Sequence, residues 1–230
     1  DAINITLTVN PEPVMSAGLN ASVCSDAVSG ITLNTNGTSI AAGSYTINSI
    51  TVATGLIPVV VASAGPGQAA NAIVNNVFTN PTAGALTVVY NVTPVTAGCA
   101  GDAISITLTV NPEPVMSTSL NAAVCSDAVS GITLATNGTS VAASSYTLNT
   151  VTVAGGLISV VEAAPGSGLA AGAIAGDIFR NTTNGPLTVV YNVTPVTAGC
   201  AGDAINITLT VNPEPVMSAG LNASVCSDAV

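Results

Sequence analysis

A 101-residue internal repeat is the feature that most constrains the fold of this chain. Residues 1–28 recur unchanged at 203–230, and residues 102–129 repeat them again, with changes at Ser105, Thr118, Ser119 and Ala123. A repeat of this length exceeds that of a solenoid and fits one small all-β domain. We therefore expect residues 1–10 to be the last strand of a preceding domain, 11–111 and 112–212 to be two complete domains, and 213–230 to be the first strand of a following domain.

Apolar and polar residues alternate along each repeat, which predicts strands with one buried face. The clearest alternations run over residues 86–93 and 103–110, and residues 98–101 between them predict a hairpin tip. Further strands are predicted at 14–23, 31–33, 45–52, 56–61 and 73–78, with a bulge near residues 48–49 and a loop at 65–72. With no helical period, the pattern predicts an all-β fold of antiparallel β-sandwiches.

Two prolines follow the last predicted strand of each repeat. Proline fixes φ and has no amide hydrogen, so this segment cannot continue a sheet and predicts a stiff extended linker. Because the linker is short, the sequence predicts that the immunoglobulin-like domains form an elongated array. The linker prolines are Pro11, Pro13, Pro112, Pro114, Pro213 and Pro215.

The charge composition excludes two classes of partner. Arg180 is the only cation, Lys and His are absent, and the net charge is −10. Nucleic-acid binding needs several Lys or Arg contacts to phosphate, and membrane attachment through a basic patch needs the same residues. No apolar run approaches the length of a membrane-spanning helix, so we expect neither nucleic-acid binding nor membrane insertion.

The second repeat resembles a known family at several motifs. These are the strand and proline at 187–195, the Gly-Cys-Ala-Gly turn at 199–202, the strand and linker at 205–216, and the segments 124–126 and 177–183. Together they resemble PKD-like, immunoglobulin-like tandem domains, which build giant surface proteins exported by type IX secretion in gliding-type bacteria. The resemblance covers both complete domains. It implies an extracellular or cell-surface location and a role in an adhesin or filament.

The residues offer little for catalysis or for a cofactor. Without His or Lys, and without paired carboxylates on one strand, we expect no enzymatic activity and no cofactor. Asp26 with Glu12, and Asp102 with Glu113, lie near the domain junctions. The dense acidic loop typical of calcium sites is absent, so solvated turn carboxylates are the better interpretation, although calcium at the junctions stays open.

The five cysteines are Cys24, Cys99, Cys125, Cys200 and Cys226. They lack the CxxC spacing of metal sites, and the exported context implied by the resemblance favours disulfides. In an immunoglobulin-like sandwich, the turn after the first strand and the tip of the last hairpin lie at opposite poles. This topology favours a bond from Cys24 to Cys200 in the next domain, with Cys99, Cys125 and Cys226 pairing outside the fragment. The within-domain alternative, Cys24 to Cys99 and Cys125 to Cys200, stays open.

The function most consistent with these features is structural. We expect a disulfide-reinforced segment of an extracellular filament or adhesin shaft, with identical chains packing laterally through uncharged faces. The alternative is an adhesin module that binds carbohydrate or another cell surface through loops at 65–72 and 165–172. Aromatic residues are only 3% of the chain, which disfavours sugar binding. The repeats also differ: Glu162, Asp177 and Arg180 replace Val61, Asn76 and Thr79.

Overall fold

The computed structural model describes residues 3–215, 217 and 220. The chain forms two compact units. The first comprises Asp1–Ser117, Thr136–Ser144 and Pro195–Asp203, and the second comprises Thr118–Ala135, Ser145–Thr194 and Ala204–Val230. The described residues contain no helix, and therefore none long and apolar enough to cross a membrane.

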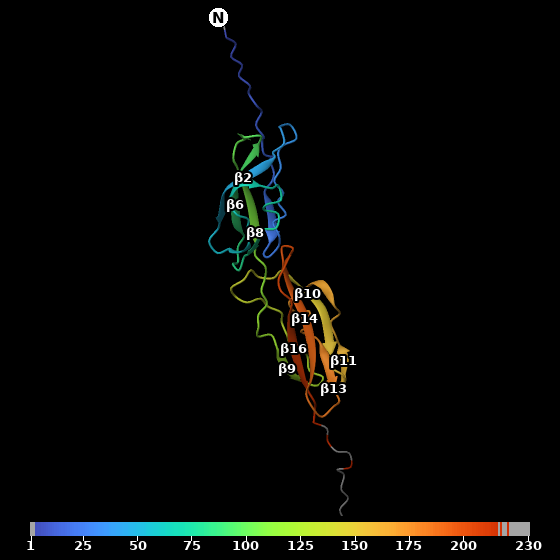
Figure 1. Ribbon diagram of the computed structural model, residues 1–230. Helices are drawn as coiled ribbons and strands as arrows, with labels where there is room; N and C mark the ends of the chain where they lie inside the picture. Colours follow the sequence, from blue (N-terminus) through green and yellow to red (C-terminus); the bar gives the residue numbers. More distant parts are fainter. Residues whose placement is uncertain (1–2, 216, 218–219, 221–230) are drawn as a thin grey trace, which may run out of the picture. The chain divides into compact units, whose positions relative to one another are not determined.

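Eight strands form the first repeat (Figure 1). They are β1 (Ala21–Cys24), β2 (Ser44–Val52), β3 (Ile57–Val60), β4 (Gly65–Gln68), β5 (Val77–Thr79), β6 (Leu86–Thr96), β7 (Cys99–Ala100) and β8 (Ile104–Asn111). The larger sheet has the order β1-β8-β6-β2-β4, with β7 paired to β6, and β3 pairs with β5 in a second sheet. The strand pairs are antiparallel except β1 with β8, which is parallel. The all-β immunoglobulin-like sandwich predicted from the sequence is confirmed.

The core of the first repeat follows from the alternation along its two longest strands. Every second residue of β6 from Val88 to Pro94 and of β8 from Ile106 to Val110 is buried. Ile47 of β2 and Phe78 of β5 complete the same apolar cluster, so both sheets contribute to it. Burial of this face is the main force that holds the sandwich together.

The predicted bulge is confirmed, because the register of β2 against β6 shifts between Ile47 and Ser49. Four other local predictions were wrong. Of residues 73–78 only 77–78 lie in a strand, because residues 70–75 form a turn. Residues 65–72 are not all loop, since β4 pairs with β2. Of residues 14–23 only 21–23 lie in a strand, because the chain turns at Gly18, where φ is +82°. Ile31 and Leu33 are buried and Thr32 is exposed, but these residues form no strand, although the Leu33 amide donates to the Ala70 carbonyl at 2.8 Å.

Eight strands with the same connections form the second repeat. They are β9 (Ala122–Cys125), β10 (Ser145–Val153), β11 (Leu157–Val161), β12 (Gly166–Leu169), β13 (Ile178–Asn181), β14 (Leu187–Thr197), β15 (Cys200–Ala201) and β16 (Ile205–Asn212). The order is β12-β10-β14-β16-β9, with β15 paired to β14, and β11 pairs with β13. Residues 101 positions apart therefore occupy equivalent places in the two sandwiches.

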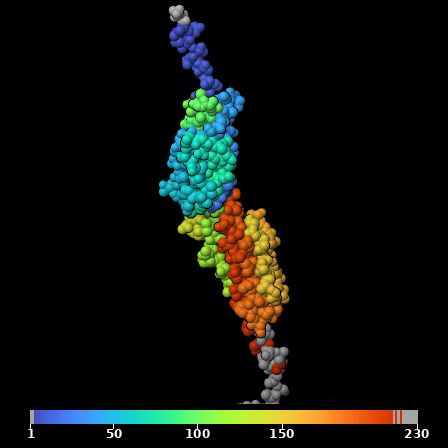
Figure 2. Space-filling view, in the orientation of Figure 1, coloured from blue at the N-terminus to red at the C-terminus, as the bar shows by residue number. Residues whose placement is uncertain are grey.

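Residues 3–10 have the same sequence as β16 but form no strand. Ile3, Ile5, Leu7 and Val9 are 82–89% exposed, whereas Ile207, Leu209 and Val211 of β16 are buried. Figure 2 shows this segment, in dark blue, extending away from the rest of the first unit. The strand conformation of this sequence therefore depends on partner strands, which residues 3–10 do not have.

Candidate functional site

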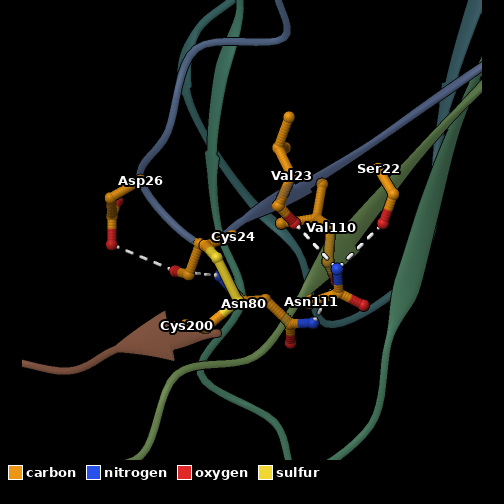
Figure 3. Close-up of a disulfide and its surroundings, with 9 residues drawn as sticks. Ser22, Val23, Cys24, Asp26, Asn80, Val110, Asn111 and Cys200 are labelled. Carbon is orange, nitrogen blue, oxygen red and sulfur yellow. Dashed lines mark hydrogen bonds between the residues drawn. A yellow bond between two sulfur atoms is a disulfide. The ribbon is translucent and has the colours of Figure 1, made fainter. Parts of the chain in front are cut away.

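Cys24 lies at the end of β1, where the chain turns away from the sheet (Figure 3). It is paired in register with Asn111, the last residue of β8, and the Asn111 side-chain amide donates to the Val23 carbonyl at 3.2 Å. The next residues form a tight turn, because the Ala27 amide donates to the Cys24 carbonyl at 3.2 Å and Asp26 has φ of +62°. The Cys24 side chain is thus fixed at the edge of the sheet where β8 leads into the linker.

Hydrogen bonds anchor this turn to the body of the first repeat. The Ser25 amide donates to the Asn111 carbonyl at 2.8 Å, and the Asp26 amide donates to the Phe78 carbonyl at 3.0 Å. The buried Asn80 side chain donates from its amide nitrogen to the Val110 carbonyl at 2.8 Å. The backbone N–H of Asn80 donates to the Ser25 hydroxyl at 2.9 Å. Buried polar groups that are this well paired hold one backbone conformation.

Cys200 lies just after the turn of the β14–β15 hairpin. We call residues 199–203 the second tip and the equivalent residues 98–102 the first tip. Ala198 and Gly199, at φ of +44° and +82°, form the two-residue turn, and Cys200 pairs with Thr197. Positive φ at both central positions is the geometry that joins antiparallel strands most tightly. The Cys200 side chain is buried, at 2% exposure.

The structure joins Cys24 to Cys200 in a disulfide whose Cα atoms are 5.5 Å apart, across 176 residues of sequence. Both cysteines belong to the first unit, because this unit includes Pro195–Asp203. Cys99, half-buried, and Cys125, exposed, are free thiols. Cys226 lies outside the described residues. The bond therefore links the first repeat to the hairpin of the second, and the pairing of Cys24 with Cys99 is not formed.

The linker prolines pack against the tips. A Cβ on Gly202 would lie 1.8 Å from the Pro114 carbonyl oxygen, and a Cβ on Gly101 would lie 1.8 Å from that of Pro13. Both prolines are buried. Only glycine allows the proline carbonyl to come this close, so each tip packs against the linker that precedes its own repeat. Of the other linker prolines, Pro112 is buried, Pro213 is half-buried, and Pro11 and Pro215 are exposed.

Carboxylates gather beside the disulfide. We call the surface formed by Cys24, Asp26, Thr79 and Glu113 the first socket. Burial raises the pKa of Glu113, and the charges of Asp26 and Asp203 and a hydrogen bond with Asp26 raise it further. The second tip therefore brings its own carboxylate, Asp203, to a socket that is already acidic.

The second repeat has the equivalent surface, formed by Cys125, Asp127, Arg180 and Glu214, which we call the second socket. It borders a pocket of about 270 Å³ lined by Ser126, Asp127, Arg180, Asn181, Thr182, Thr183 and Glu214. The Arg180 Nε–H donates to both carboxylate oxygens of Asp127, at 3.0 and 3.1 Å. The hydrogen bond to Asp127 and the charge of that carboxylate raise the pKa of Arg180; desolvation opposes the increase, and the charge of Glu214 adds to it.

A second difference between the repeats lies in the cores. The buried Asn76 donates from its side-chain nitrogen to the Tyr90 hydroxyl at 2.9 Å and accepts from the Ala62 amide at 2.9 Å. At the equivalent position Asp177 accepts from the Ala163 amide at 3.0 Å. Its other carboxylate oxygen and the hydroxyl of Tyr191 have no hydrogen bond of ordinary geometry.

Burial raises the pKa of Asp177, outweighing the opposing influence of the Tyr191 hydroxyl and the Ala163 amide. Burial also raises the pKa of Tyr191, which the neighbouring Asp177 carboxylate raises further. The pair is therefore a poorly satisfied polar contact in the core, unlike the well-bonded Asn76–Tyr90 pair.

The described residues hold no group of three or more acidic, Cys or His side chains placed to bind a metal ion. The sequence analysis did not identify Asn80, Asn181, Gly101 or Gly202 as residues of the junction. A signal for the two asparagines was present, because Asn80 and Asn181 recur at the 101-residue spacing while their neighbours Pro81 and Thr182 differ.

A family model described as PKD-like domain matches residues 21–114 and 122–215. No curated protein matches the chain. Similar solved structures include human CDH23 EC21-23, at 16% identity, covering 88% of this chain and 69% of that chain with a TM-score of 0.32. Mouse clustered PcdhgC3 EC1-3 has 10% identity, covers 90% of this chain and 69% of that chain, and has a TM-score of 0.28.

Proposed function

Because the chain belongs to the PKD-like domain family, we propose that it is a structural segment of a long bacterial cell-surface filament or adhesin shaft, exported by type IX secretion. The observation that carries this proposal is the Cys24–Cys200 disulfide, which joins one repeat covalently to the next. Such a bond restricts the unfolded chain and persists in an oxidising, extracellular environment. The role is non-enzymatic and requires no cofactor.

Self-association between identical chains is the second part of the proposal. In both repeats the smaller sheet exposes an aliphatic strand, β3 with Ile57, Val59 and Val60, and β11 with Ile158 and Val160, each about half exposed. Exposed aliphatic strands on a weakly charged surface favour packing against neighbours. Because these faces lack Lys and contain few carboxylates, we expect lateral packing that depends little on ionic strength.

The alternative role, binding of carbohydrate or another cell surface through inter-strand loops, has less support. All six aromatic side chains of the chain are buried, at 6% exposure or less. No ring is therefore presented for stacking on a sugar. The segments expected to serve as binding loops also contain β4 and β12, whose backbones pair with neighbouring strands.

Electron microscopy of the native assembly tests the proposal, and ordered bundles of threads are the expected result. With the purified chain, light scattering should show association that persists when salt is raised. Val59→Glu with Val160→Glu should weaken it, whereas Ile40→Glu, at an exposed aliphatic residue outside both strands, should not. Lone threads, dissociation by moderate salt, or a reproducible glycan ligand would contradict the proposal.

A further inference from the structure

Both repeats fasten the end of the first strand of the smaller sheet with the same hydrogen bond. The Ala62 amide donates to the side-chain oxygen of Asn76 at 2.9 Å, and the Ala163 amide donates to a carboxylate oxygen of Asp177 at 3.0 Å. The donor follows β3 or β11, and the acceptor directly precedes β5 or β13. This bond, which we call the latch, therefore ties the end of each strand to the start of its partner strand.

The second atom of the acceptor side chain must donate a hydrogen bond to a buried tyrosine. Asn76 does so, because its side-chain nitrogen donates to the Tyr90 hydroxyl at 2.9 Å. An ionised Asp177 has no hydrogen to donate, and neither its second oxygen nor the Tyr191 hydroxyl has a hydrogen bond of ordinary geometry. A protonated Asp177 has the shape of asparagine and can donate its O–H to Tyr191. The neutral acid therefore fits this site better than the carboxylate.

The charges around Asp177 also favour its neutral form. The negative charge of Glu162 acts on it, whereas the first repeat has the uncharged Val61 at that position. Arg180, the only cation of the chain, is exposed on the outer face of β13 and pairs with a different carboxylate. The other titratable group that acts on Asp177 is Tyr191 of β14, whose own pKa burial raises. Ionisation therefore places a charge in the core without a cation to offset it.

The end of β11 is the part of this site that can yield when Asp177 ionises. β14, which carries Tyr191, lies between β10 and β16 and pairs with other strands on both sides. Among the described strands β11 pairs only with β13, and Val161 at its end is about half exposed. Glu162 and the Ala163 amide move with that end, so one local opening separates the two carboxylates and admits water to Asp177.

We propose that deprotonation of Asp177 opens the latch and releases the end of β11 from β13, which makes the second repeat pH-sensitive where the first repeat is not. Below the ordinary aspartate value of 3.8, the acid form keeps the latch closed. Because burial raises the pKa of Asp177 in the closed form, the open population grows as pH rises and levels off above the raised pKa. The proposal concerns a single chain in solution and does not depend on the proposed structural role.

Amide hydrogen exchange of the full chain, followed by NMR in dilute solution from acidic to neutral pH, tests the proposal. The protection factor of Ala163, which corrects for the intrinsic pH dependence of exchange, should fall by up to about tenfold per pH unit until the raised pKa is passed. The Ala62 amide is the matched control, because it donates to the uncharged Asn76 and should keep a nearly constant protection factor. Asp177→Asn should make Ala163 behave as Ala62 does.

Two further variants separate burial from charge. Glu162→Gln removes the neighbouring charge and keeps the size of the side chain. It should make the fall in Ala163 protection smaller and end it at lower pH, because burial alone then opposes ionisation of Asp177. Asn76→Asp should give Ala62 a pH dependence that it lacks in the unchanged chain.

Urea distinguishes a local release from unfolding of the repeat. Low urea concentrations should leave the exchange of Ala163 unchanged, because a local opening exposes little surface, whereas exchange of the β14 amides should accelerate. Three outcomes would overturn the proposal. These are protection factors of Ala163 and Ala62 that change together with pH, a pH dependence of Ala163 that persists in Asp177→Asn, and exchange of Ala163 that responds to urea as β14 does.

Discussion

Replacing Asp177 with Asn should stabilise the second repeat. The change recreates the Asn76 arrangement, in which the side-chain nitrogen donates to a buried tyrosine hydroxyl at 2.9 Å. It gives the Tyr191 hydroxyl a hydrogen bond of ordinary geometry and removes a buried carboxylate oxygen that has none. Leaving a buried polar group unpaired costs about 1–3 kcal/mol, so we expect the free energy of unfolding to rise by about 2 kcal/mol at neutral pH.

The gain should depend on pH. Because the pKa of Asp177 is raised in the folded state, the folded chain binds the proton more tightly than the unfolded chain does. The contribution of Asp177 to stability is therefore largest below the ordinary aspartate value of 3.8 and is lost as pH rises through the raised pKa. The advantage of Asp177→Asn should be small near that lower value and should reach its full size above the raised pKa.

Urea denaturation followed by circular dichroism measures this gain, and hydrogen exchange with mass spectrometry locates it. Peptides from β13 and β14 should become more protected in Asp177→Asn, while β6 of the first repeat serves as an internal control. The reverse change, Asn76→Asp, should destabilise the first repeat by a similar amount. The reasoning is refuted if Asp177→Asn leaves stability unchanged at neutral pH, or if its effect grows as pH falls.

Three further changes test the junction. Gly202→Ala should lower the denaturation midpoint and reduce the free energy of unfolding by about 1–3 kcal/mol, because the alanine Cβ would overlap the Pro114 carbonyl. A Cβ at Gly185 would meet open space, so an equal loss of stability from Gly185→Ala would contradict this reasoning. Cys24→Ser should lower the thermal midpoint, since closing a 176-residue loop stabilises by roughly 5 kcal/mol in the chain-entropy limit; an unchanged midpoint would show that the loop closure contributes nothing. Glu113→Gln should raise the free energy of unfolding most at neutral pH, because burial and neighbouring carboxylates raise the Glu113 pKa and its ionisation opposes folding. A gain confined to acidic pH would contradict this direction of the pKa shift.

The sequence predicted the fold where one face of a strand is buried. The alternation in residues 86–93 and 103–110 matches β6 and β8, and the phase slip near Asn48 matches the bulge. Prediction from the sequence failed where a strand is formed by backbone pairing without an apolar face. The Gly-rich β4 has no apolar alternation, and its place at the sheet edge depends on β2, which local sequence does not encode.

The junction was predictable only in part. The positions of Cys24 and Cys200 at a first turn and a last tip follow from the strand order, but two pairings fitted the sequence. The choice depends on β1 pairing with the end of β8, because this register places Cys24 beside Asn111 and the start of the linker. The ion pair of Arg180 with Asp127 joins residues 53 positions apart, and only the folded strands bring them together.

The Cys24–Cys200 bond changes how the chain would respond to stretching. A force applied before Cys24 and after Cys200 passes through the sulfur atoms and bypasses the 176-residue loop between them. At about 3.4 Å per extended residue, this bond withholds roughly 600 Å of contour length. An oxidised chain pulled in a single-molecule instrument would lengthen only through the segments outside the loop. Reduction of this one bond would release the rest, so the extensibility of the chain is set by redox chemistry.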